Sequence, residues 1–451
     1  MFLRSVSLIG LVALGTVATG CRCPSGGCVP STPCAPCSYE LTVADAEPPE
    51  LAELIAQRDA DESLLQPLPQ PGETYLALDA ATCQCNAVAN AYQANMVELE
   101  RHWACVQIEC DSGAVAENLL LFRDGFALRA HSIRNKAAST ALESFYQLGG
   151  LEAQQRYLNL VLQETRQSLQ RLESLEEEGV ELPDDVNKAD IQTRLQEIED
   201  QQFQLHFARL TLNGQLQKQL GCPISEHQFY WPKIDWVAEP VPLDAEGEVL
   251  QGLETRADVR AVRLVLCHAK KKTLPVVRAL LKTSDPTVGS VEPQEGLRHR
   301  VLCLRCNEHE IPVRCRQLAL LYEEKRQLAT GEIKSACYEI VLRHRRVLLA
   351  QGTVDLRQQH LNMLTKKRDA QDVAVFEISQ ARGKLYEAQS ALVQRLVELK
   401  IAQMGLRRAK NVLPSECGFI PILCEEGCCD SECFCCQSGC QSSCEKDCVC
   451  D

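Results

Sequence analysis

The sequence predicts an all-α or mainly α protein, a tandem repeat of long coiled-coil-like helical hairpins with degenerate or absent β-strands. Two stretches of 111 and 101 residues contain no proline, between Pro71 and Pro183 and between Pro312 and Pro414. Such stretches suit long helices, because proline removes a backbone donor and clashes with the preceding turn. Only 5% of the 451 residues are aromatic, which is low for a β-rich protein.

The first hairpin is predicted from a coiled-coil seam whose members step by four and three residues. The seam comprises Leu158, Leu162, Thr165, Leu169 and Leu172, and it resumes at Ile191, Leu195, Ile198, Leu205, Leu212 and Leu216. The break between the two parts contains Gly179, Val180 and Asp185. Glycine can end a helix in the left-handed conformation and aspartate can cap the next one, so these residues are the expected first tip.

The second hairpin carries an apolar residue at every seventh position, at Ile378, Leu385, Leu392, Leu399 and Leu406. Its tip is expected at Gly352, Thr353 and Asp355, where a glycine is again followed by an aspartate. The two tip glycines are 173 positions apart (179 to 352), and a shorter helix is predicted before each hairpin, at about 76–102 and 254–283. The chain is therefore predicted to be a duplication of one shorter helix and one long hairpin.

The N-terminus carries features of export. Residues 1–20 are predicted to be a signal peptide, because Arg4 precedes an apolar stretch too short for a membrane span. The segment Ala18–Cys21 resembles the lipobox of bacterial lipoproteins, which implies a diacylglyceryl group on Cys21 and membrane attachment through it. Conventional cleavage after Gly20 is the alternative, because the residues before the cut also fit a small-x-small rule.

The 26 cysteines indicate an oxidising compartment and concentrate at the two ends, with five in residues 21–37 and eleven in 417–450. The eleven in the tail predict either a disulfide mesh or a thiolate cluster that holds a soft metal ion. In the body, four N or S groups within 13 residues form a weak candidate zinc site: Cys303, Cys306, His309 and Cys315. Their spacing matches no standard zinc finger, so neither a metal nor a cofactor is expected.

These patterns divide the chain into six segments. They are a signal peptide (1–20), a Cys/Pro-rich linker after the lipid anchor (21–73), a first helical repeat (74–222), an irregular connector (223–253), a second helical repeat (254–413) and a Cys-rich tail (414–451). The connector is inferred from its four prolines and from an aromatic run at 229–231.

Charge and motifs exclude several classes of function. The formal net charge of -14 disfavours nucleic acid as a partner. The sequence contains no phosphate loop, no Gly-x-Gly-x-x-Gly and no Gly-x-Ser-x-Gly. We therefore expect a protein that is not an enzyme.

Two segments resemble the TolC-like outer-membrane efflux family, over roughly residues 74–412. The first, 179–190, follows the family's tip pattern of glycine, then aspartate and an aliphatic residue, then alanine and an acid. The second, 256–261, resembles the Arg-Pro-Asp-hydrophobic-Arg-Ala opening of the second repeat, with Ala257 in place of proline. The resemblance implies a homotrimer, an α-helical tunnel in the cell envelope at the outer membrane facing the periplasm, and a periplasmic adaptor and inner-membrane pump as partners.

The sequence departs from the family where an amphipathic β-hairpin is expected in each repeat. Membrane strands need about 9–11 residues of alternating polarity with aromatic girdles, and the equivalent regions, 103–130 and 284–312, supply neither. We expect a divergent member that lacks most of these hairpins and acts as a passive conduit or a periplasmic scaffold with a pump. The alternative is an envelope-anchored coiled-coil scaffold whose Cys-rich ends bind soft metal or form cross-links.

Overall fold

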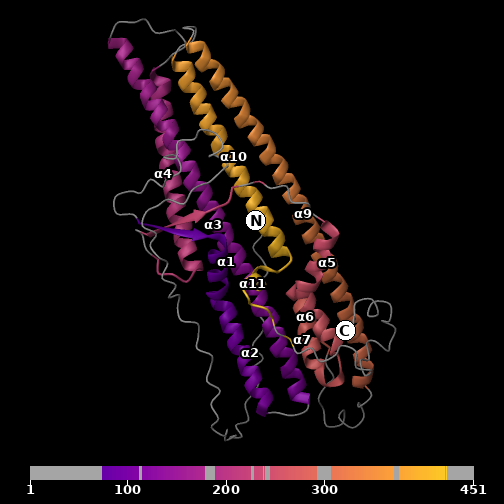
Figure 1. Ribbon diagram of the computed structural model, residues 1–451. Coiled ribbons are helices and arrows are strands. Elements are labelled where there is room, and N and C mark those ends of the chain that lie inside the picture. The colour runs from indigo at the N-terminus through magenta and orange to yellow at the C-terminus, as the bar shows by residue number, and fades with distance from the viewer. Residues whose placement is uncertain are drawn as a thin grey trace.

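Helices make up most of the computed structural model of the chain (Figure 1), which confirms the mainly α prediction. The structure describes residues 74–110, 114–177, 188–224, 228–236, 238, 244–291, 306–369, 375–421 and 423. In chain order the elements are β1 (Thr74–Asp79), α1 (Ala80–Ala89), α2 (Tyr92–Cys110), α3 (Ala114–Glu177), α4 (Lys188–Gln219), β2 (Gln228–Lys233), α5 (Ala245–Thr255), α6 (Ala257–Cys267), η2 (Lys271–Thr273), α7 (Leu274–Ser284), α9 (Cys306–Asp369), α10 (Val375–Ala409) and α11 (Leu413–Glu416).

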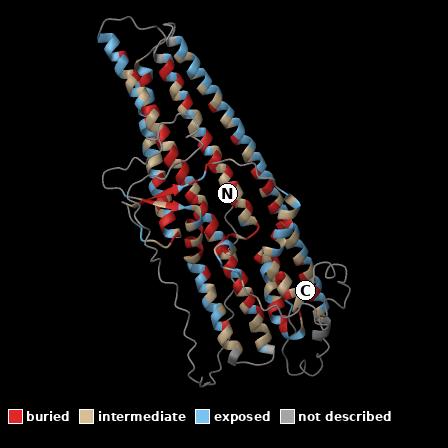
Figure 2. Cartoon of the chain, viewed as in Figure 1, coloured by how far each residue is buried: buried red, intermediate tan, exposed pale blue. Residues whose placement is uncertain are grey.

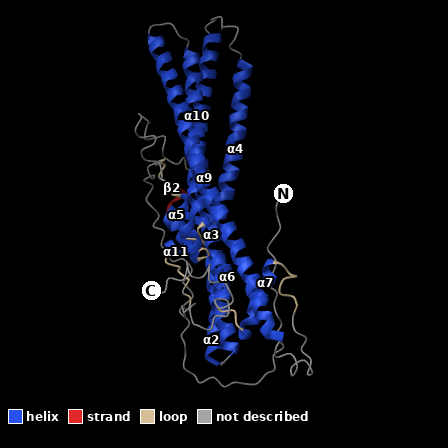
Figure 3. Cartoon of the chain, turned by 90° about the vertical axis from the view of Figure 1, so that its right-hand side faces the viewer, coloured by secondary structure: helices blue, strands red, loops and turns tan. Residues whose placement is uncertain are grey.

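Two helices of 64 residues each, α3 and α9, run the length of the molecule. At 1.5 Å per residue each spans about 96 Å. In the upper half α4 folds back along α3 and α10 folds back along α9, and α10 also packs on α3. The four long helices therefore form one layer in the order α4, α3, α10, α9, with neighbours antiparallel (Figure 1). Figure 3 shows the same helices from the side.

The lower half continues this layer with shorter helices. There α2 packs along α3 on the side that α4 occupies above, and α6 lies between α3 and α9. The prediction of one shorter helix before each hairpin is wrong, because each predicted range is divided among several elements. Residues 76–102 form most of β1, α1 and part of α2, while 254–283 form the end of α5, α6, η2 and most of α7. Because the Asp79 carboxylate accepts a hydrogen bond from the Thr82 amide (2.7 Å), the chain turns from β1 directly into α1.

A small sheet crosses the layer and joins the two repeats. Strands β1 and β2 are parallel, with Thr74 opposite Gln228 and Asp79 opposite Lys233. The predicted irregular connector is therefore wrong in part, because it contains β2 and most of α5. The sheet lies close to α3 at Gly149, where a Cβ atom would stand 2.2 Å from Ile234 Cδ1. Glycine at this position lets the chain after β2 cross the helix.

The expected tip at Gly352, Thr353 and Asp355 is wrong, because all three lie inside α9. The Thr353 hydroxyl donates to the Leu349 carbonyl (3.1 Å), and Asp355 accepts from the Gln351 amide (3.1 Å), so both side chains act within one helix. Glycine in an exposed helix costs only about 1 kcal/mol relative to alanine, which α9 tolerates. The connection to α10 is residues 370–374, which contain neither glycine nor proline.

The duplication itself is present. Each half contains a strand, short helices, a 64-residue helix and a shorter returning helix. The 64-residue helices begin 192 positions apart (114 to 306), rather than at the expected spacing of 173.

Buried residues follow the long helices where they face one another and include consecutive residues of β2 (Figure 2). The largest apolar cluster joins β1, β2, α1, α3, α9 and α10. All five members of the seven-residue repeat on α10 are buried: Ile378, Leu385, Leu392, Leu399 and Leu406. The core of the layer was therefore predicted correctly at α10.

Candidate functional site: the helical layer and its edges

Polar contacts between neighbouring helices hold the layer in register. They join α4 to α3, α3 to α10 and α10 to α9 in turn. The contacts are Gln202 to Asn159 (2.5 Å), Gln154 to Gln394 (2.9 Å), Ser168 with Ser379 (2.8 Å) and Arg343 to Glu398 (2.6 Å). Because each contact has one geometry, the helices cannot slide past one another without losing hydrogen bonds.

A buried ion pair lies where the sheet crosses α3 and α4. Arg209 of α4 is only 1% exposed, and its Nε donates to Glu152 of α3 at 2.6 Å. The same guanidinium donates to the hydroxyl of Tyr75 on β1 and stands 4.0 Å from the ring centroid of Phe229 on β2. The pair therefore fastens the sheet to the layer, because Arg209 contacts both strands and both helices.

A second buried arginine stands beside this pair. Arg156 is one turn from Glu152 on α3, and its guanidinium carbon is 5.9 Å from the ring centroid of Trp231. Its three guanidinium nitrogens have no hydrogen-bond partner among the described residues. Burial lowers the pKa of Arg156 to about 10, although the nearby Glu152 charge opposes that shift. The cluster thus holds two cationic side chains and one carboxylate, which makes Glu152 its essential counter-ion.

The layer has two open edges, because α4 packs on α3 alone of the long helices and α9 on α10 alone. On α4, Phe203 and Phe207 are 76% and 72% exposed. On α9 a strict seven-residue repeat of exposed apolar side chains comprises Leu342, Leu349, Leu356 and Met363. In the lower half α2 exposes a comparable stripe, which comprises Tyr92, Met96, Leu99 and Trp103. Both edges thus expose apolar stripes that pack on no other helix among the described residues.

No protein-family model matches the sequence, and no curated protein matches it either. Solved structures match it along most of its length. The chain is similar to the Neisseria gonorrhoeae MtrE outer membrane channel in its open state, with 10% identity, a TM-score of 0.53, and coverage of 74% of this chain and 88% of that one. It is also similar to the Campylobacter jejuni CmeC outer membrane channel (10% identity, TM-score 0.52, 74% and 85% covered) and to CusC (14%, 0.52, 73% and 91%). The chain has a TolC-like fold.

Within this TolC-like fold, the Arg-Ala-Asp segment expected at the start of the second repeat forms a junction. Arg256 precedes α6 and makes two hydrogen bonds to Asp258 (3.0 and 2.8 Å). It also pairs with Glu332 of α9 and donates to the Ala409 carbonyl at the end of α10 (3.3 Å). Burial would raise the pKa of Asp258, but the Arg256 hydrogen bonds hold it below its usual value. Arg256 therefore joins the start of α6 to α9 and to the end of α10, at the level where α6 replaces α10 between α3 and α9.

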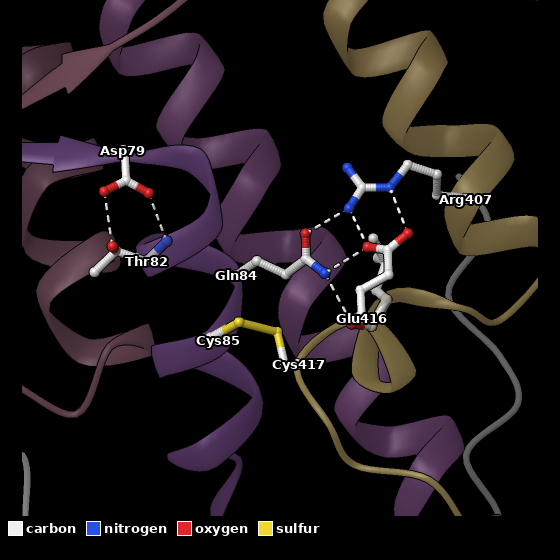
Figure 4. The surroundings of a disulfide bond; sticks show 8 residues. Asp79, Thr82, Gln84, Cys85, Arg407, Glu416 and Cys417 are labelled. Carbon is white, nitrogen blue, oxygen red and sulfur yellow. Dashed lines mark hydrogen bonds and ion pairs between the residues drawn. A yellow bond between two sulfur atoms is a disulfide. The ribbon is translucent and has the colours of Figure 1, made fainter.

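A disulfide joins α1 to the segment that follows α11 (Figure 4). Cys85 of α1 bonds to Cys417, which follows α11 and is the first of the eleven tail cysteines. Beside it, Gln84 donates to Glu416 (2.8 Å) and accepts from Arg407 of α10 (2.7 Å), while Arg407 also pairs with Glu416. The start of the tail is therefore fastened to the first helix of the chain.

The remaining predicted residues are distributed as follows. Cys21, Cys303 and the first tip (Gly179, Val180 and Asp185) lie outside the described residues. Cys306 and His309 begin α9, and Cys315 is buried one to two turns further on, in an apolar cluster with α6 and α7. In the part of the chain that the structure describes, no three His, Cys, Asp or Glu side chains are grouped in a way that could hold a metal ion.

Among the described residues, no helix combines the length and the apolar composition that a bilayer crossing requires. The first of the two regions expected to depart from the family is helical where it is described, because 103–110 completes α2 and 114–130 begins α3. In the second, 285–291 form turns after α7, and 306–312 begin α9.

The two open edges were not predicted, although the signal was available. Leu342, Leu349, Leu356 and Met363 recur every seven residues, as the buried α10 repeat does. Periodicity cannot separate the two, because a seam that faces its own chain and a seam that faces another have the same pattern.

Proposed function

We propose that the chain is one protomer of a homotrimeric, TolC-like passive conduit in the cell envelope, at the outer membrane and facing the periplasm. In this proposal Cys21 carries the lipid anchor, and the protein has no enzymatic activity. The coarser role, an efflux-type channel component, is supported by the likeness to MtrE and CmeC, which are outer membrane channels.

The main support for this proposal is the helical layer with its two open edges. Its helices alternate in direction from α4 to α9, so α4 of one copy placed beside α9 of the next continues the same alternation. A contact between two different edges repeats from copy to copy and forms a ring when the rotation closes. A closed ring of such layers encloses a tunnel, whereas a single layer encloses nothing.

The hairpin tips are the proposed contact for a periplasmic adaptor and an inner-membrane pump. The helices α3 and α9 end, and α4 and α10 begin, at the same end of the layer (Figure 1), so trimerisation would gather six hairpins around one opening. Movement of the tips would then open and close the tunnel, while the pump would supply the energy.

Native mass spectrometry and bilayer conductance of the full-length, lipidated protein test this function. We expect a trimer and, in lipid bilayers, a stable conductance. A protein that stays monomeric in mild detergent and in lipid would contradict the conduit. A trimer without conductance would exclude an autonomous pore and favour a periplasmic scaffold that works with a pump.

A second candidate function is cross-linking or soft-metal binding by the Cys-rich ends. The Cys85–Cys417 disulfide favours cross-linking at the start of the tail, because a cysteine in a disulfide is no longer a thiolate ligand. Alkylation with and without reductant, followed by mass spectrometry, separates the two roles. Full protection that only reductant removes would exclude metal capture, and thiols that a chelator exposes would support it.

A further inference from the structure

We propose that Phe203 and Phe207 of one copy seat on α9 of the next, around a notch that Gly352 leaves between Leu349 and Leu356. This inference rests on the proposed ring and names the surfaces that close it. Gly352, which the sequence predicted at a hairpin tip, thereby becomes part of an interface between copies.

Helical geometry places the exposed apolar side chains of α4 and α9 on the faces that point out of the layer. A helix turns by about 100° per residue, so Phe207, nine positions after the buried Ile198, lies on the opposite side of α4. By the same rule Leu356, nine positions after the buried Val347, lies on the side of α9 opposite α10. Both seams therefore point away from their own layer.

Contacts through the layer place the two seams at one height. Arg209 of α4 pairs with Glu152 of α3, and Gln154 of α3 bonds to Gln394 of α10. One turn below Gln394, Glu398 pairs with Arg343 of α9. Gln154 lies two residues above Glu152, so Arg209 is level with about residue 345 of α9.

Counting upward along both helices brings Phe207 level with about residue 347, half a turn below Leu349. Phe203 then lies level with about residue 351, beside Gly352. A rotation about an axis that runs along the layer does not change heights, so the match within one chain also holds between copies in a ring.

The glycine provides room for a large ring. A Cβ atom added at Gly352 would have no heavy atom within 4 Å, so the position is open to the outside of the helix. With Leu349 three residues before it and Leu356 four residues after it, Gly352 forms the floor of a gap in the seam. Knobs-into-holes packing places one side chain of the facing helix in such a gap.

Charges at the next turn are complementary. Asp200 of α4 and Arg357 of α9 are exposed, and neither has an ion pair within the described part of its own chain. Asp200 lies one turn above Phe203, and Arg357 follows Leu356, so the same register places the two charges within about one turn of each other. This pairing favours a second copy of the chain over lipid as the occupant.

Photo-crosslinking of the full-length protein tests the contact without adding to its cysteines. With p-benzoylphenylalanine at position 207, we expect cross-linked dimers whose partner peptide is residues 347–357, the tryptic fragment that contains Leu349, Gly352 and Leu356. The control position is Ile420, which is exposed but lies away from both edges, and it should not capture this peptide. Capture of a different peptide from position 207 would overturn the inference.

Two matched substitutions test the notch. Gly352→Ala and Gly352→Phe both improve helix propensity, but only the phenylalanine fills the gap. We expect Gly352→Phe to weaken trimer association by about tenfold or more, and Gly352→Ala to change it little. Equal association of both variants would overturn the inference.

Charge reversal distinguishes this inference from the ring itself. Asp200→Arg and Arg357→Asp should each weaken the trimer, and the double variant should restore it. If wild-type protein forms no trimer, the proposed function fails. If the trimer forms and none of these variants affects it, the ring stands and the interface described here is wrong.

Discussion

The two 64-residue helices, α3 and α9, are equivalent in the duplication but differ in what surrounds them. Buried acidic and basic side chains collect on α3, which carries Asp124, His131, Arg134, Glu152 and Arg156 in this class. On the described part of α9 only Arg314 is both buried and charged. Instead α9 exposes apolar side chains along most of its length, from Val313 to Met363.

The position in the layer explains this difference. Helices cover α3 on both sides, and the sheet, α1 and α11 cover it further, so its polar groups must find partners inside the protein. In the upper half α9 packs on one described long helix, α10, so no other described long helix covers its outer face. Duplicated elements therefore diverge according to whether they are central or at an edge. Three predictions test this contrast.

The largest effect is expected from Glu152→Gln on α3. This change leaves the buried Arg209 and Arg156 without their carboxylate, and breaking a buried pair costs about 3–5 kcal/mol. The matched change on α9 is Glu339→Gln, which removes an exposed partner of Arg343 and should cost about 0–1 kcal/mol. Urea unfolding at one protein concentration measures both free energies. Similar values for the two variants would break the comparison.

The next effect depends on pH and concerns His131 on α3. Burial, together with Arg260 and Arg134, lowers the pKa of His131 from 6.5 to about 4. The neutral ring contacts Ser415 (3.0 Å) and Asn411 (3.2 Å). Between pH 6.5 and 4 the unfolded state binds a proton that the folded state does not bind. The free energy of unfolding should therefore fall by about 3 kcal/mol as the pH decreases through this window.

His131→Gln removes this term and keeps a side chain that can hydrogen bond. The difference in unfolding free energy between wild type and variant should therefore change progressively from pH 7 to pH 4. A difference that stays constant over this range would show that His131 does not resist protonation in the folded protein.

The smallest effect compares a glycine on each helix. Gly149→Ala on α3 places a Cβ against Ile234, and the overpacking should outweigh the gain in helix propensity, for a net cost of about 1 kcal/mol. Gly352→Ala on α9 meets open space and should stabilise the protomer by up to about 1 kcal/mol. Thermal or urea unfolding measures the change in unfolding free energy for each variant. A decrease for Gly149→Ala with an increase for Gly352→Ala would sharpen the contrast, and changes of the same sign would contradict it.

Local patterns were sufficient for some features and misleading for others. The buried repeat from Ile378 to Leu406 was predicted from spacing alone, because each member needs only its own helix to define a face. The second tip was misplaced because Gly352 and Asp355 have the composition of a turn, whereas the real connection at 370–374 has no glycine. The pairing of β1 with β2 was missed because six-residue strands 154 positions apart leave no periodic signal.

The sequence by itself determined the mainly α class, the duplication and the apolar faces of the long helices, because helical periodicity is a property of neighbouring residues. Only the tertiary structure decided which of those faces is covered. The stripe on α10 meets α3 and α9, whereas the equally regular stripe on α9 meets no helix in the described part of the chain. That decision depends on contacts between residues far apart in the sequence, so it separates the core of the layer from the edge proposed to bind the next copy.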